Sequence, residues 1–318
     1  MRAYVVRRLL LIIPTLFLLT TLLFFMLRVI PGDVAMGTLA SAEASAVSKE
    51  EVERLRRDLG LLDPLYVQYG RWLWATVRGN LGYSYMMQSS VARALVQKVP
   101  VSLTLAVLAV ALAVFWAIPL GIISALKRGS WLDNGIRIFT AVGIALPNFW
   151  VAILVLVALV QFFNWSPPVK YVSIFKDPAA SLSMFIFPAL VIGYRQASLI
   201  SRMTRSMMLE VIHQDYVRTA RAKGLRGLTV VMRHALPNAS LPVLTISATV
   251  LAALIEGAVV IEVVFNLPGL GRLIQQAVFQ RDYALVQGIV MALGVLMLLW
   301  ILIVDMLYGW LDPRIRYR

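Results

Sequence analysis

The sequence contains no cysteine and only two histidines, His213 and His234. Without cysteine, neither a disulfide framework nor a thiolate metal site can form. The two histidines have no third ligand nearby, which disfavours a histidine-based metal site. A hydrolase needs a nucleophile with a base, or a metal cluster, and these residues supply neither. We therefore expect no catalytic residues and no bound metal in this chain.

A phosphate-binding loop is also absent from the sequence. No segment has the Gly-x-x-x-x-Gly-Lys-Ser/Thr pattern that cradles nucleotide phosphates. Gly224 and Gly227 are too closely spaced for this pattern, and no lysine follows them. Any nucleotide chemistry associated with this protein therefore belongs to another chain.

Acidic residues are scarce as well. The 16 Asp and Glu residues face 30 Lys and Arg residues, for a formal net charge of +14. Such an excess of cations is compatible with nucleic-acid binding. The arginines border long apolar runs, however, where membrane topology alone explains them. We therefore prefer a membrane protein to a nucleic-acid-binding protein.

Hydrophobic residues are abundant. They make up 60% of the chain, and the mean hydropathy is +0.80, whereas soluble domains are usually about 45–50% apolar. A run of about 20 apolar residues crosses a bilayer as a helix. We predict an all-α integral membrane protein with a single domain over residues 1–318. The six expected transmembrane helices lie at residues 9–30, 101–126, 138–163, 182–204, 241–264 and 285–308. Pro119, Pro147, Pro188 and Pro242 are expected to bend these spans or to mark their ends.

The distribution of positive charge predicts the orientation. The short segments 1–8, 127–137, 202–233 and 309–318 together carry sixteen Lys and Arg, whereas 164–181 and 265–284 carry four. The side richer in cations is cytoplasmic. Both termini are therefore expected in the cytoplasm, which agrees with an even number of spans.

Residues 31–98 are then expected outside the cell membrane as a short helical segment. Ser48 and Glu51 form a capping-box pattern, and Gly60 is placed to end the helix that follows. Asp63-Pro64 predicts the start of a second helix, with Leu65, Tyr69, Trp72 and Leu73 on one side. Such a pair of helices can rest on the membrane surface, cover a pore mouth or contact a partner.

The polar segment 206–238 predicts two short helices on the cytoplasmic face. Asp215 is placed to cap the first helix, which runs to Lys223, and Gly224 to end it in a left-handed turn. In the second helix, an apolar stripe has the spacing of one helical face. Pro237 is expected to stop that helix, and Asn238 or Ser240 to cap the next span. The stripe consists of Leu228, Val231, Met232, Ala235 and Leu236, and it suits packing beneath the bundle as well as docking on a partner.

This segment resembles the cytoplasmic loop of binding-protein-dependent ABC importer permeases. Its pattern is Asp215-Tyr-Val-Arg-Thr-Ala-Arg-Ala-Lys-Gly224, then nine residues, then His234-Ala-Leu-Pro237. Arg218 stands where the family has glutamate and His234 where it has isoleucine, and these departures are similar to the peptide/nickel branch. Further fragments resemble the same branch in order and spacing, most closely the B-type dipeptide/oligopeptide permeases. They are Tyr4–Arg8, Ile30–Asp33, Leu59–Pro64, Gly79–Gly82, Glu256–Glu262, Pro268–Gly271 and Leu311–Tyr317.

The resemblance implies a type I ABC importer permease fold and a non-catalytic pore subunit in a bacterial inner membrane. It also implies a homologous second permease, two cytoplasmic ATP-binding subunits that bind the ATP and magnesium, and an extracytoplasmic solute-binding protein. The implied cargo is di- or oligopeptides, with nickel, glutathione or oligosaccharides as alternatives. The residues implied to couple the permease to the ATPase are Asp215, Tyr216, Arg218, Thr219, Ala220, Gly224, Leu228, Val231, Met232, His234, Leu236 and Pro237.

The roles of two charged residues inside the predicted spans can be interpreted in two ways. Arg195 and Glu256 lie at depths where a charge must face protein or water. They either line the passage and meet the termini of a peptide, or pair with each other or with the second permease. A secondary transporter is a rival function, but it often carries inverted repeats. We find no internal repeat, and that function leaves the loop 206–238 unexplained.

Overall fold

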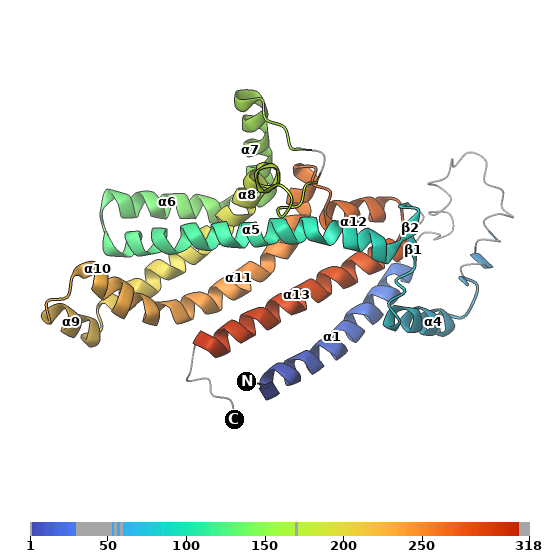
Figure 1. Cartoon of the computed structure of the whole chain (residues 1–318), viewed down its shortest axis with the longest axis horizontal. Coiled ribbons are helices and arrows are strands. Elements are labelled where there is room, and N and C mark those ends of the chain that lie inside the picture. Colours follow the sequence, from blue (N-terminus) through green and yellow to red (C-terminus); the bar gives the residue numbers. More distant parts are fainter. Residues whose placement is uncertain are drawn as a thin grey trace. The chain divides into compact units, whose positions relative to one another are not determined.

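The computed structural model describes residues 2–29, 53, 56–57, 60–84, 86–168 and 171–311. Within these ranges it does not describe the side chains of residues 2–9, 241–242, 244–246, 248–256, 305 and 307–311. The described chain is almost entirely helical (Figure 1). It forms two compact units, which are treated separately below. Unit 1 comprises Met1–Val5, Leu103–Leu267 and Trp300–Arg318, and unit 2 comprises Val6–Ser102 and Pro268–Leu299.

Unit 2 has an apolar core between helices from both ends of the sequence. Its elements are most of α1 (Arg2–Val29), α4 (Leu65–Val77), the antiparallel pair β1 (Tyr83–Ser84) and β2 (Ser89–Ser90), the first part of α5 (Val91–Leu126), α12 (Leu270–Phe279) and the first part of α13 (Tyr283–Leu311). Val91, Leu95, Leu270 and Leu285 are among the buried residues of its core. Asp282, between α12 and α13, accepts a hydrogen bond of 2.6 Å from the Ser84 hydroxyl. The carboxylate thereby attaches the short hairpin to the end of α12.

The second predicted outer helix is present as α4. It begins at Leu65 with Pro64 as its N-cap residue. Tyr69 and Trp72 pack against the ring of Phe24 in α1, and the Tyr69 hydroxyl lies 2.7 Å from that of Thr21. This aromatic cluster holds α4 on the end of α1. The predicted capping box at Ser48 lies outside the described residues. Of the helix expected after it, the structure describes residues 53 and 56–57, which are helical, and Gly60, which has φ +63°.

Unit 1 contains the remaining helices (Figure 1). They are the second part of α5, α6 (Trp131–Ala145), α7 (Asn148–Phe163), α8 (Pro178–Ile212), α9 (Asp215–Ala222), α10 (Gly227–Val230), a π-helical turn (Val231–Ala235) and α11 (Leu236–Val264). Local sequence starts two of them: Ser130 accepts from the Asp133 amide, and Asp177 from the Ala180 amide. These hydrogen bonds satisfy amides that the helix leaves open.

Glycines let the helices of unit 1 approach α8 closely. A Cβ on Gly121 of α5 would lie 2.5 Å from the Thr204 Cβ and 2.7 Å from the Ser201 carbonyl oxygen of α8. A Cβ on Gly143 of α6 would likewise collide with Ser198. Real Cβ contacts are longer than this, so a side chain at either position would push α8 away.

The structure confirms the helical membrane character but changes one predicted span. Within the described residues, four helices are long and apolar enough to cross a membrane: Leu10–Val29, Val91–Leu126, Pro178–Ile212 and Tyr283–Val304. The predicted span 138–163 is not one continuous helix, because α6 and α7 are bent by 107° relative to each other. Counted together, they make a fifth span. The break falls at Pro147, which forces the preceding Leu146 into an extended conformation (φ −83°, ψ 136°).

The other predicted helical regions are recovered with different ends. α5 begins before the span predicted at 101–126 and ends with it. α8 begins before the span predicted at 182–204 and ends after it. α11 covers the predicted span 241–264 as one helix. Pro119, Pro188 and Pro242 lie inside continuous helices and do not end them.

Candidate functional site

The first helix of the loop between α8 and α11 forms as predicted, apart from its cap. α9 covers Asp215–Ala222, and Gly224 has φ +77°, the left-handed conformation expected there. The prediction that Asp215 caps α9 is wrong. Gln214 is the N-cap residue and makes no side-chain capping bond. Asp215 is the first helical residue, where its negative charge favours the helix dipole, and its carboxylate lies 3.7 Å from Arg218.

The second loop helix runs into α11 without a stop. α10 is followed by the π-helical turn, and the Leu236 amide donates to the Val231 carbonyl, five residues back. The prediction that Pro237 stops the helix is therefore wrong. A proline is tolerated in the first turn of a helix, and the wider π turn precedes it here. Asn238 and Ser240 do not cap the span either, since both donate to backbone carbonyls of the preceding turn, those of His234 and Pro237.

The predicted apolar stripe separates into two rows. Val231 is 5% exposed and Ala235 is fully buried, and both pack with Ala125 and Met208 beneath the bundle. Leu228 is 73% exposed and Met232 53% exposed. Positions four residues apart share a helix face, so each pair forms its own row. Leu236 is partly buried at the edge of the inner row.

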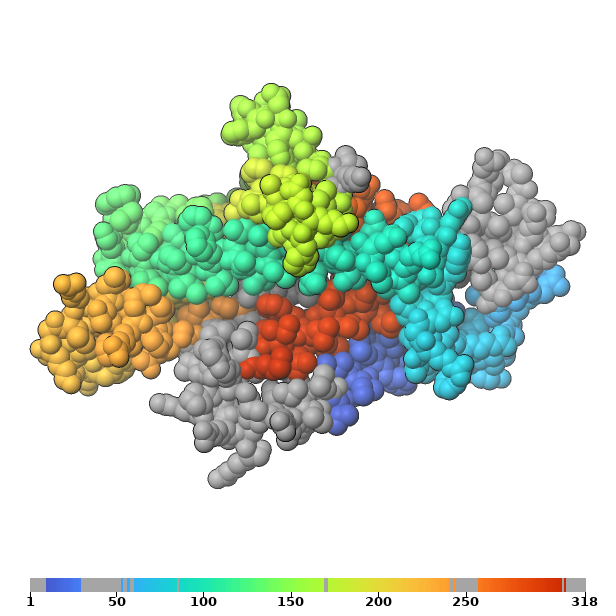
Figure 2. Space-filling view, in the orientation of Figure 1, coloured from blue at the N-terminus to red at the C-terminus, as the bar shows by residue number. Residues whose placement is uncertain are grey.

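The two loop helices are held together by a small apolar cluster. Val217 and Ala220 of α9 pack with Val230 of α10 and with Val211 at the end of α8. This cluster fixes the loop to the helix that leads into it. Figure 2 shows the surface of the loop in orange at one end of unit 1.

Four large apolar side chains remain exposed on this loop, and we call them the loop patch: Tyr216, Leu225, Leu228 and Met232. Partial burial raises the pKa of the Tyr216 phenol, although a hydrogen bond with Asn238 opposes this, so the side chain is uncharged at neutral pH. Cations surround the patch in the same loop, all of them exposed: Arg218, Arg221, Lys223, Arg226 and Arg233.

The remaining predicted loop residues have structural contacts. The Thr219 hydroxyl donates to the Asp215 carbonyl at 2.9 Å, within α9. His234 lies partly buried in the π-helical turn. Within the described ranges, no three His, Asp or Glu residues are grouped so as to hold a metal ion. The structure therefore gathers the predicted coupling residues into one two-helix loop, where Leu228, Met232 and Tyr216 are exposed and Val231 and Ala220 are buried.

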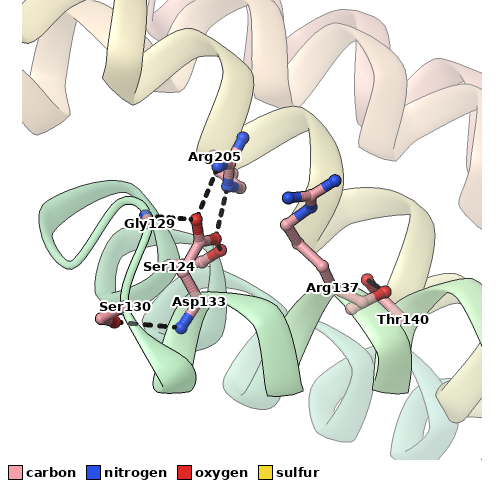
Figure 3. A network of polar contacts seen from close by, with 7 residues as sticks. All are labelled: Ser124, Gly129, Ser130, Asp133, Arg137, Thr140 and Arg205. Atoms are coloured by element: carbon pink, nitrogen blue, oxygen red, sulfur yellow. Dashed lines mark hydrogen bonds and ion pairs between the residues drawn. The ribbon is translucent and has the colours of Figure 1, made fainter.

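A buried ion pair that sequence reasoning missed supports this loop from the side of α8. Asp133 of α6 is 1% exposed and binds Arg205 of α8 through both oxygens, at 2.8 and 2.9 Å (Figure 3). The Ser124 hydroxyl donates to the same carboxylate at 2.6 Å and the Gly129 amide at 3.0 Å. Two-pronged pairs of arginine and carboxylate are strong and geometrically specific. The network ties the α5–α6 turn to the part of α8 that precedes the loop.

The predicted pathway residues are only partly described. Arg195 is exposed on α8. Glu256 lies in α11, in the stretch whose side chains are outside the description, so the predicted alternative of an Arg195–Glu256 pair stays a prediction.

Comparison with known proteins shows that the chain is similar in sequence to transport permeases. The sequence profile described as "Binding-protein-dependent transport system inner membrane component" matches residues 117–317. The profile of the N-terminal region of such membrane components matches residues 1–106. A Brucella abortus protein described as a peptide transport system permease is 40% identical over 100% of both chains.

Two further comparisons agree with this. The oligopeptide transport system permease AppB of Bacillus subtilis is 36% identical and the dipeptide transport system permease DppB of Escherichia coli K12 is 37% identical, each over 100% of both chains. A solved structure of the MetNI methionine ABC transporter in an inward-facing conformation matches with a TM-score of 0.53 at 16% identity, covering 69% of this chain and 96% of that one. At this identity, the last comparison supports the fold alone.

Proposed function

The chain belongs to the family of binding-protein-dependent transport system inner membrane components, and from this we propose that it is the membrane subunit of an ATP-driven importer for di- and oligopeptides. The observation that carries the proposal is the full-length identity of 36–40% to permeases named for peptide transport. A nickel, glutathione or oligosaccharide importer of the same architecture is the alternative within the branch.

The proposed assembly contains four further chains. They are a homologous second permease, two ATP-binding subunits that hold the ATP and magnesium, and an extracytoplasmic solute-binding protein. The family description supports the binding protein, and the fold likeness to an ABC transporter supports the ATP-driven assembly. In this assembly the present chain catalyses no reaction. We propose that it crosses the bacterial inner membrane six times with both termini in the cytoplasm, because its cations gather on that side.

We propose that the loop between α8 and α11 transmits the motion of the ATPase. The exposed row of Leu228 and Met232, with Tyr216 and Leu225, would insert into a groove of an ATP-binding subunit. Burying such side chains contributes several kcal/mol at about 25 cal/mol per Å². The inner row and the Val217–Val230 cluster keep the loop rigid, so that rotation of the ATPase turns α8 and α11 with it. Asp133 and Arg205 extend that rigid body to α6.

Reconstitution tests the function. The chain is assembled with its companion permease, ATP-binding subunits and binding protein in liposomes, and accumulation of a labelled dipeptide is measured. We expect accumulation only with ATP and the loaded binding protein. A proton gradient that drives uptake without ATP would establish the secondary transporter instead. ATP-driven uptake of nickel, glutathione or an oligosaccharide, with none of peptides, would select the alternative cargo.

A further inference from the structure

Two exposed arginines share one face of α8. Arg195 and Arg202 are seven residues apart, which is two helical turns, or about 10 Å along the axis at roughly 1.5 Å per residue. Ser206, four residues further, lies on the same side. All three side chains are exposed, although α8 is otherwise a largely buried helix with many contacts to its neighbours. The face therefore borders water or another molecule.

The inner end of this face opens into a cavity of about 660 Å³ between α6 and α8. Figure 3 shows Arg137 of α6 directed toward α8 at this place. The polar residues that line the cavity are Asn134, Arg137 and Thr140 from α6 and Arg202, Arg205 and Ser206 from α8.

The cavity carries uncompensated positive charge. Arg205 is neutralised by Asp133, which it binds through two contacts. Arg137 and Arg202 have no ion pair within the part of the chain that the structure describes. A guanidinium near the end of a membrane-spanning helix faces water or an anion rather than lipid tails. The planar fork of arginine suits a carboxylate through two parallel hydrogen bonds, and the Asn134 amide and Ser206 hydroxyl add neutral donors.

We infer that this cavity is a binding site at the cytoplasmic end of the transport pathway and that it binds the C-terminal carboxylate of the peptide. Arg195 holds that carboxylate first, and Arg137 and Arg202 receive it before release into the cytoplasm. The inference rests on the proposed function. Arg137 and Arg202 are both exposed on the described chain, so each interaction is weak enough for the cargo to leave, as a conducting pathway requires.

A charge-replacement experiment tests whether the cavity binds the peptide carboxylate. Because this chain has no cysteine, Arg202→Cys gives it a single thiol, and the variant is assembled into the complete importer. That thiol is treated with either cationic aminoethyl methanethiosulfonate or neutral methyl methanethiosulfonate. Peptide uptake and ATP hydrolysis are measured with saturating binding protein. Arg128→Cys, an exposed cation outside the cavity, is the matched control, and the unmodified complex treated with each reagent controls for thiols of the partner chains.

We expect Arg202→Cys and Arg137→Gln each to lower peptide uptake about tenfold, which corresponds to about 1.4 kcal/mol at the barrier. ATP hydrolysis with the empty binding protein stays unchanged, because only the cargo is lost from the site. The cationic reagent restores uptake by Arg202→Cys, and the neutral reagent does not. Arg128→Cys transports as the unmodified complex does.

Three results would overturn the inference: unchanged uptake in both variants, equal rescue by the two reagents, or an equal loss of ATP hydrolysis with empty binding protein. The importer is also compared in vesicles of phosphatidylcholine alone and with phosphatidylglycerol. A defect seen only with the anionic lipid would assign the cavity to a lipid phosphate and refute a cargo site. Failure of the unmodified complex to import peptides would instead contradict the proposed function.

Discussion

Leu228→Asp probes the exposed row of the loop. Leu228 is 73% exposed, and full burial of a leucine side chain contributes about 1.5–3 kcal/mol. Covering the exposed part by an ATP-binding subunit is therefore worth about 1–2 kcal/mol. Aspartate loses this contribution and adds the cost of burying a charge. We expect the affinity for the ATP-binding subunits to fall at least about tenfold.

The assay for this variant measures two quantities in the reconstituted importer: the peptide imported per ATP hydrolysed, and the ATP-binding subunits retained by the purified permease. Both should fall, while the thermal unfolding of the chain is unchanged because Leu228 contributes little buried area. Phe175→Asp is the matched control, since Phe175 is equally apolar, 95% exposed and outside the loop. Normal coupling and normal subunit retention in Leu228→Asp would refute the assigned role of the loop.

Three other predictions concern the support of the loop. Asp133→Ala leaves Arg205 without its partner and should destabilise the chain by about 3 kcal/mol, seen as a lower midpoint of thermal unfolding; an unchanged midpoint would contradict the role of the pair. Gly224→Pro cannot adopt φ +77° and should uncouple ATP hydrolysis from uptake, whereas Gly224→Asn tolerates the left-handed turn and should transport; equal transport by both would rule out this requirement. Gly121→Val collides with Thr204 and should destabilise by about 1–3 kcal/mol, unlike Gly135→Val, which meets open space; equal stability of the two would show that α5 and α8 do not pack closely.

The sequence predicted the parts of the loop that depend on local chemistry. Gly224 marks a left-handed turn because other residues rarely adopt it, and the end of α9 lies there. Pro147 was expected to bend or end a span, and it separates α6 from α7. The angle between them was beyond prediction, because it is set by packing against other helices.

Tertiary packing determines which row of the loop helix is buried, and the sequence pattern alone does not. The spacing of Leu228, Val231 and Met232 predicts an apolar helix surface, but two adjacent rows have that spacing. Only the contacts of Val231 with the bundle show which row is inside. The π-helical turn has no local signal beyond the proline that follows it.

The Asp133–Arg205 pair joins residues 72 positions apart, which no local pattern reveals. One signal was available: Asp133 is the sole acidic residue between Asp63 and Asp177. A lone carboxylate at the cationic end of an apolar run is a candidate for a buried pair. Its partner, however, is one of several arginines in that region and required the structure.

A photo-reactive amino acid at position 228, replacing the exposed Leu228, tests directly whether the loop contacts an ATP-binding subunit. The substituted chain is assembled into the active importer, irradiated with and without ATP, and its cross-linked products are identified by mass spectrometry. We expect a cross-link between the loop and an ATP-binding subunit in both states. Cross-links only to lipid or to the permease's own helices, in a complex that still imports peptide, would contradict the proposed role of the loop.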